Sequence, residues 1–381
     1  MTKHKNQHYI PQFYLRNFSH DGIGLYRYSL TKKRSERSRL NKTCASRGYY
    51  VEGPEAAEFE KRLSALESCH AKILQKIMDK CSLGILSSEN FLSFCMFLLL
   101  TRMRNPAAKK EIVNIANHSF DLTEDITSRW LHSLEDHSPN LEAMLEVIKN
   151  PISIADLLPI LLINKTKRPF VTSDSPVVFY NYIHVDGINL DGCLSQGLLV
   201  FLPLSEKITL CLFDSAIYEP NVITPTGNIN LKYYRPNIIT PTGNINLTNK
   251  RDVNALNRLQ LLNADEYVIH SKLEHTDYIS SVLHDDKLEG LRVKSISSRE
   301  KIEYKVGEDG FTHIYQPKPH YVHRFSFFEE NERYIADLKK KVAIGRKFGQ
   351  LPNLFRNPII ADHLLPNTEQ ESLGNTNGTA V

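Results

Sequence analysis

The chain has 381 residues, with 47 Lys and Arg against 43 Asp and Glu, a formal charge of +4 and 41% hydrophobic residues. These values are ordinary for a globular protein and exclude a disordered, collagen-like or membrane-embedded chain. A charge of +4 is too small to indicate a nucleic-acid partner by itself, and the length allows roughly two to three domains or one large domain with an insertion.

The N-terminal residues and the cysteines predict where the protein works. No apolar segment follows the charges of the first eight residues, and none of the six cysteines forms a C-x-x-C pair. We therefore expect no signal peptide and no zinc ribbon. The longest apolar stretch, 91–100, is about half of the roughly 20 residues that cross a bilayer. Thiols of a chain that is not exported stay reduced, so we expect a cytoplasmic protein without a membrane partner.

The first half of the chain changes from strand to helix patterns. Gly24–Leu30 alternates apolar and polar side chains, which is typical of a half-buried strand. The basic segment 32–42 is interpreted as a solvated loop rather than a nucleic-acid patch, because no aromatic residue interleaves with its charges. From Pro54 to about Gly84 one apolar stripe predicts a long helix, on which His70 is expected to be a core or rim histidine. A second helix, 88–104, is apolar on every side and is expected to be buried.

The second half of the chain returns mainly to strand patterns. After further helical pattern over 112–148, strands are predicted at 170–172, 177–180, 198–202, 208–213, 267–270, 292–294 and 301–305, with a helix over 251–263. Residues from 366 onward are small and polar and are expected to be disordered. The fold class is therefore α+β, a mixed or antiparallel sheet with an inserted helical subdomain. The predicted boundaries are 1–53 and 164–310 for the α+β domain, 54–163 for the helical subdomain and 311–381 for a C-terminal extension.

One segment is nearly repeated. Residues 221–231 and 237–247 differ at one position and lie sixteen residues apart. Two copies are too few for a solenoid. The Thr-Pro-Thr-Gly-Asn letters are turn chemistry, so each copy is expected to form a hairpin-like excursion in a tolerant loop. A Thr/Asn-rich ligand loop is the alternative interpretation.

The segment His8–Phe18 is the densest candidate for chemistry. Pro11 is well placed to open a short helix, on which Gln12 and Arg16 share one face at a spacing of four. Imidazole, amide and guanidinium groups together can position a phosphate and move a proton. The alternative is a docking helix whose polar groups only satisfy buried backbone.

A second candidate follows the strand at 170–172. Thr172, Ser173 and Asp174 stand at the strand end, where Asp174 is a candidate general base or ligand of a divalent metal ion. The same residues are also common turn formers. Arg102 and Arg104 are candidate phosphate-binding cations, and Asn254 and Asn257 add a polar helix face.

Several standard constellations are absent from the sequence. It contains no Walker A loop, no G-x-G-x-x-G, no H-E-x-x-H and no G-x-S-x-G. The strand after Asp174 also lacks the E-x-K that a PD-(D/E)xK nuclease requires. No standard catalytic constellation can therefore be assigned from the sequence.

The segment from His8 to Phe18 is similar to the opening signature of the domain-of-unknown-function 4238 family, which occurs mainly in bacteria. Further segments fit the family's usual order: Tyr49–Tyr50 before a Glu-rich helix, Arg104–Pro106, Val171–Val177, Pro203–Ser205, and an Asn-containing helix (254–257) leading to a strand that ends at Ser271. The resemblance covers roughly residues 5 to 275, although the family more often has Asn at position 175. It confers no mechanism, but it implies that His8, Gln12, Arg16 and Asp174 converge on one site.

Two classes of function follow from these observations. In the first, the protein is a hydrolase or nuclease of bacterial defence that acts on a nucleotide or nucleic acid. There His8 is the acid/base, Asp174 a metal ligand or base, and Arg16, Arg102 or Arg104 bind phosphate. In the second, the same groups recognise an anionic ligand or a protein partner without catalysis. The sequence leaves open whether the protein is an enzyme, its metal dependence and its oligomeric state.

Overall fold

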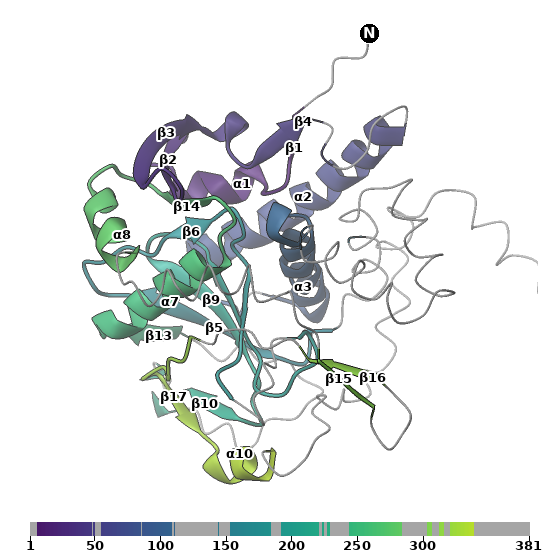
Figure 1. Ribbon diagram of the computed structural model, residues 1–381, viewed down its shortest axis with the longest axis vertical. Helices are drawn as coiled ribbons and strands as arrows, with labels where there is room; N and C mark the ends of the chain where they lie inside the picture. The colour runs from purple at the N-terminus through teal and green to yellow at the C-terminus, as the bar shows by residue number, and fades with distance from the viewer. Residues whose placement is uncertain are drawn as a thin grey trace, which may run out of the picture.

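The computed structural model describes residues 6–47, 49, 55–84, 86–108, 110, 144, 153–183, 192–220, 223–224, 227–228, 244–283, 303–306, 312–315 and 321–338. Figure 1 shows a central sheet flanked by helices, with the N-terminal strands at one end of the molecule. The fold is α+β, as predicted, with mixed and antiparallel sheets.

The central sheet has five strands in the order β13-β5-β9-β8-β7. Their bounds are β5 (Leu158–Asn164), β7 (Val178–Tyr180), β8 (Leu199–Pro203), β9 (Ile208–Phe213) and β13 (Asn244–Leu247). All neighbours are antiparallel except β13 and β5, which run parallel. The sheet is therefore mixed.

Both faces of the central sheet are buried. Successive side chains along each strand point to opposite faces and enter two separate apolar cores. On β8, Val200 and Leu202 belong to the core shared with α2 (Glu55–Lys80) and α3 (Ser88–Met103), whereas Leu199 and Phe201 belong to the core shared with α7 (Lys250–Asn263). The α3 helix is buried on nearly every side after its N-cap, Ser87, as its uniformly apolar sequence predicts.

A second, four-stranded antiparallel sheet has the order β3-β2-β14-β6. It consists of β2 (Gly24–Ser29), β3 (Arg34–Arg39), β6 (Thr172–Ser173) and β14 (Tyr267–His270). One face packs Leu25 and Ile269 into the main core, and the other packs Tyr28 and Val268 against α7 and α8 (His275–Leu283). The helix α8 therefore lies over the β2 and β14 strands.

Short elements complete the described structure. The pairs are β1 (Asn6–His8) with β4 (Ala45–Arg47), β10 (Tyr218–Pro220) with β17 (Phe328–Glu330), β11 (Ile223–Thr224) with β12 (Gly227–Asn228), and β15 (Glu303–Val306) with β16 (Thr312–Tyr315). The remaining helices are α1 (Gln12–Leu15), the 3-10 turns η1 (Arg16–Phe18) and η2 (Leu40–Lys42), and α10 (Glu332–Leu338).

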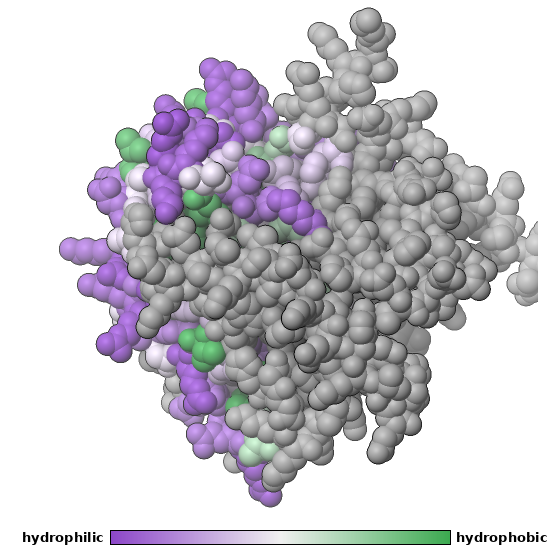
Figure 2. Space-filling model, viewed as in Figure 1, coloured by the Kyte–Doolittle hydropathy of each residue, from purple (hydrophilic) through white to green (hydrophobic). Residues whose placement is uncertain are grey.

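Two sequence predictions are wrong. The segment 32–42 is not all loop, because residues 34–39 form β3, an edge strand paired along its length with β2. Its charged side chains give no apolar alternation, so backbone pairing rather than burial holds it; Figure 2 shows hydrophilic residues gathered over this end of the molecule. The sequence predicts helices over 54–163, yet residues 158–164 form β5, since a short continuous apolar run fits a buried strand as well as a helix.

The near-repeat behaves differently in its two copies. In the first copy, β11 and β12 pair as a small hairpin, as predicted. In the second copy, Asn244, which is equivalent to Asn228, is the first residue of β13 at the edge of the central sheet. The predictions for 112–143 and 145–148, for 292–294, and for the tail from 366 lie outside the described residues.

Candidate functional site

His8, the predicted acid/base, is the last residue of β1 and lies near the end of α3. His8 is half-buried and pairs with Ala45 on β4. Pro11, with a φ of −60°, leads directly into α1, as predicted. On that helix the side chain of Gln12 is half-buried, and the Arg16 that follows it is exposed. Gln12 and Arg16 therefore remain candidates by position only.

We define the His8 cluster as His8, Glu67 and Arg104. The side chain of Arg104, which directly follows α3, is only 2% exposed, whereas that of Glu67 on α2 is 27% exposed. The Arg104 Nη1 lies 2.7 Å from Glu67 Oε1, and its Nε donates to the backbone carbonyl of Tyr9 at 2.8 Å. The buried guanidinium thus joins the end of α3 to α2 and to the residue that follows β1.

The charges of this cluster act on His8. Burial lowers the pKa of His8; the carboxylate of Glu67 opposes that shift and the guanidinium of Arg104 adds to it. A histidine with a lowered pKa is neutral at pH 7 and has one ring nitrogen that accepts a proton. His8 is therefore in the protonation state that a general base requires.

Aromatic and apolar groups surround the cluster. Tyr9 packs against Tyr49 with ring centroids 5.2 Å apart. His70 is buried against Phe97 at 5.3 Å, and burial lowers its pKa to about 4. His70 is thus a core histidine, as its place on the apolar stripe predicts. Arg104 itself is 2% exposed, and burial strengthens its electrostatic interactions.

Arg102 and Arg104, the two predicted phosphate-binding cations, point to different parts of the molecule. Arg102 in the last turn of α3 lies 4.3 Å from the ring centroid of Phe179 and donates to the carbonyl of Val177 at 3.4 Å. Arg104 instead pairs with Glu67. Residues two apart on a helix differ by about 200° in direction, which explains the separation. Only Arg104 is part of the His8 cluster.

Asp174 serves the turn between α7 and β14. It is 1% exposed, and its carboxylate accepts from the backbone amides of Asp265, Glu266 and Tyr267 at 2.8, 2.7 and 2.9 Å. Burial raises the pKa of Asp174 to about 7, although the three amide donors favour the carboxylate. This geometry accounts for Asp174 as a structural acceptor, and its predicted catalytic role stays a prediction.

The hydroxyls before Asp174 also have structural partners. The Thr172 Oγ1 lies 2.6 Å from the Tyr14 hydroxyl, which donates to the carbonyl of Pro203 at 2.7 Å. The Ser173 hydroxyl donates to Gln260 Oε1 at 3.0 Å. These bonds fasten β6 to α1 and α7, so they position the scaffold.

The predicted asparagines fasten α7 in the same way. Asn257 is buried, donates to the carbonyl of Pro169 at 2.9 Å and accepts from the amide of Val171 at 3.1 Å. The Asn254 Oδ1 accepts from the Tyr278 hydroxyl at 2.9 Å. Neither asparagine lies in the His8 cluster as defined.

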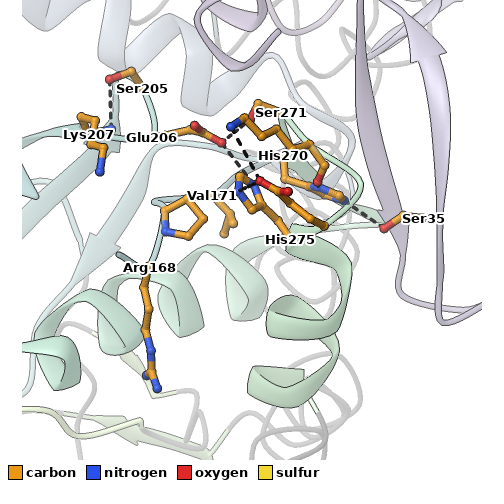
Figure 3. Close-up of polar contacts among 12 residues, drawn as sticks. Ser35, Arg168, Val171, Ser205, Glu206, Lys207, His270, Ser271 and His275 are labelled. Atoms are coloured by element: carbon orange, nitrogen blue, oxygen red, sulfur yellow. Dashed lines mark hydrogen bonds and ion pairs between the residues drawn. The ribbon is translucent and has the colours of Figure 1, made fainter. Parts of the chain in front are cut away.

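A second polar group was missed by sequence reasoning. We define the α8 cluster as Ser35, Glu206, His270, His275 and Thr276. Figure 3 shows Glu206 reaching from the β8–β9 turn toward His275, while Ser35 on β3 faces His270. The Glu206 Oε1 lies 3.2 Å from His275 Nδ1, and hydrogen bonds from His275 and Ser271 keep the pKa of Glu206 below its usual value despite burial. These residues lie on four separate segments of the sequence, so no local sequence motif predicts the cluster.

Glu67 was missed for a different reason. It lies three residues before His70, inside a long helix that contains many glutamates. Its ion pair with Arg104, at the end of α3, becomes visible only in the structure. Within the described ranges, no three His, Cys, Asp or Glu side chains are grouped so that they could hold a metal ion.

Comparison with known proteins gives one match. The model of a family described as "Protein of unknown function (DUF4238)" matches residues 6–274. No curated protein and no solved structure matches the chain. In the described part of the chain, no helix has both the length and the apolar content to span a membrane.

Proposed function

The chain belongs to the DUF4238 family, and we propose that it binds a phosphate-bearing ligand at the His8 cluster, where His8 acts as an acid–base group. Three segments that carry the family resemblance meet at this place, those around His8, Tyr49 and Arg104. The observation that carries the proposal is the buried guanidinium of Arg104 behind a more exposed carboxylate.

The difference in exposure between Arg104 and Glu67 sets the route of binding. Glu67 is the solvent-side member of the pair, at 27% exposure against 2% for Arg104. An anion that arrives from solvent therefore meets Glu67 first, and it gains the buried cation by displacing this flexible side chain. Arginine forms paired hydrogen bonds to phosphate as readily as to carboxylate, so the exchange replaces one charge-assisted contact by another.

The neutral imidazole of His8 supplies the chemical step. In the hydrolysis of a phosphoester, the ring nitrogen takes a proton from the attacking water, while Arg104 stabilises the negative charge on the phosphoryl oxygens. The leaving oxygen takes its proton from solvent. A purely ligand-sensing protein would share the binding step and lack turnover, so the two functions separate in one set of measurements.

Calorimetric titration with inorganic phosphate and with a nucleoside monophosphate tests the binding. Because Glu67 competes with the ligand, Glu67→Gln should tighten phosphate binding by about tenfold, equivalent to about 1.4 kcal/mol. Arg104→Gln should abolish it. Glu274→Gln, at an exposed carboxylate in another part of the molecule, removes the same charge and should leave the affinity unchanged.

A structural ion pair would give the opposite result. If Glu67 and Arg104 only fasten α2 to α3, Glu67→Gln lowers the unfolding midpoint and does not tighten phosphate binding, which would exclude the proposal. His8→Gln should keep phosphate affinity within about twofold and remove turnover of a nitrophenyl phosphate panel; turnover absent in the wild type assigns the ligand-sensing function.

A further inference from the structure

The α8 cluster contains a hydroxyl held against a buried imidazole. Ser35 lies on the edge strand β3, His270 is the last residue of β14, and Thr276 is in the first turn of α8. The Ser35 Oγ lies 2.9 Å from His270 Nε2, and the Thr276 hydroxyl lies 2.8 Å from Ser35 Oγ. Figure 3 shows the Ser35 and His270 side chains facing each other, and β2 lies between their two strands in the sheet.

The partners of His270 determine its tautomer. Its Nδ1 lies 2.8 Å from the backbone carbonyl of Lys272, which can only accept a hydrogen bond, so Nδ1 carries a proton. Burial lowers the pKa of His270 to about 4, so the ring is neutral at pH 7 and Nε2 has a lone pair. The Ser35 hydroxyl therefore donates to Nε2, and the Thr276 hydroxyl donates to Ser35.

This order of groups is the one that activates a serine. A nucleophile donates to an imidazole, and a third group on the far side of the ring fixes the tautomer. Here the carbonyl of Lys272 takes the place that a carboxylate holds in many hydrolases. The carboxylate of Glu206 lies near enough that its charge raises the pKa of His270, while the neighbouring His275 lowers it. Glu206 thus favours the imidazolium that forms when Ser35 loses its proton.

Exposure makes the serine the accessible end of this chain of hydrogen bonds. His270 is fully buried, whereas Ser35 is half-buried, and most of the other residues of β3 are exposed.

We propose that Ser35 is a nucleophile activated by His270 and that this edge of the sheet hydrolyses activated carboxylic esters, independently of the His8 cluster. The Ser35 Oγ bonds to the carbonyl carbon, its proton passes to His270 Nε2, and the ester oxygen leaves with that proton. Water then attacks the acyl-serine, gives a proton to His270 and releases the acid, and the proton returns to Ser35. Thr276 and the Lys272 carbonyl are positioning groups.

A fluorophosphonate probe tests the proposal without knowledge of the natural ester. Attack by an activated serine forms an Oγ–P bond and expels fluoride, and peptide mass spectrometry locates the label. We expect one labelled peptide, modified at Ser35. The label should be lost in Ser35→Ala, and the labelling rate should fall about 100-fold or more in His270→Gln, which keeps a polar side chain but removes the base.

Matched variants separate activation from folding. Ser281→Ala removes a hydroxyl of α8, the helix that carries Thr276. The Ser281 hydroxyl donates to the carbonyl of Tyr278, so the labelling rate of this variant should equal that of the wild type. Thr276→Val should slow labelling while the thermal midpoint shows that the fold is kept. The proposal is overturned if the folded wild type is unlabelled, if the label lies on Ser271 or another residue, or if Ser35→Ala is labelled at the wild-type rate. None of these outcomes bears on phosphate binding at the His8 cluster.

Discussion

Asp174→Asn separates a structural role for this carboxylate from a catalytic one. At pH 8, above its pKa of about 7, Asp174 is charged and accepts from the amides of residues 265, 266 and 267. Asparagine keeps one acceptor oxygen and turns an NH₂ group toward the remaining amide donors. One buried donor left unpaired costs about 1–3 kcal/mol, and loss of charge assistance in the other bonds costs about 1 kcal/mol more. Relief of the buried charge offsets part of this, so we expect a net loss of about 2 kcal/mol.

Urea unfolding at pH 8, followed by far-UV circular dichroism, measures this loss. Asp21→Asn is the matched control, because Asp21 also accepts from two backbone amides, those of Ile23 and Gly24, but in an exposed turn where water replaces it. The control should lose much less stability. A change below about 1 kcal/mol in Asp174→Asn would refute the reasoning, and a stable variant without phosphoesterase turnover would restore the catalytic role.

Two further predictions concern buried polar groups. Tyr14→Phe removes a hydroxyl that joins Thr172 to the Pro203 carbonyl, so we expect a loss of about 1–3 kcal/mol by urea unfolding and a smaller further loss when Thr172→Val is added; full additivity would contradict it. The pKa of His70 is about 4 in the folded protein and 6.5 in a free side chain, so between these pH values the unfolded state binds one more proton than the folded state. The free energy of unfolding should therefore be highest above pH 6.5 and fall by about 3 kcal/mol toward pH 4. Unfolding midpoints across this range should flatten in His70→Gln; an unchanged slope would contradict the prediction.

Much of the fold could be predicted because its elements have strong periodicity. The apolar stripe of α2 and the uniformly apolar α3 were located within a few residues, and so were β8, β9, α7 and β14. Elements held by pairing rather than by burial were not predictable: β3 consists of Arg, Ser and Glu and becomes a strand only because β2 offers it a backbone partner. The apolar run of β5 was ambiguous until its neighbours were known.

The candidate site was predictable only in part. The convergence of His8, Gln12, Arg16 and Asp174 that the resemblance implies stays a prediction. The partner of Arg104 is Glu67, which lies in a helix without a motif. Asp174 and Asn257 are polar residues that the sequence offers as candidates. In the structure both are buried and form hydrogen bonds with backbone groups. The α8 cluster joins residues more than two hundred positions apart, so sequence spacing contains no signal for it.

The near-repeat has a thermodynamic consequence. The strand β13 reads Asn-Ile-Asn-Leu, and the same four letters occur at 228–231, sixteen residues earlier. A chain that lost those sixteen residues would still offer β5 the same edge strand, with only the connection before it shortened. The entropy of closing a connection changes by only about 0.6 kcal/mol for each doubling of its length. The free energy of folding of the central sheet is therefore expected to depend only weakly on the number of copies.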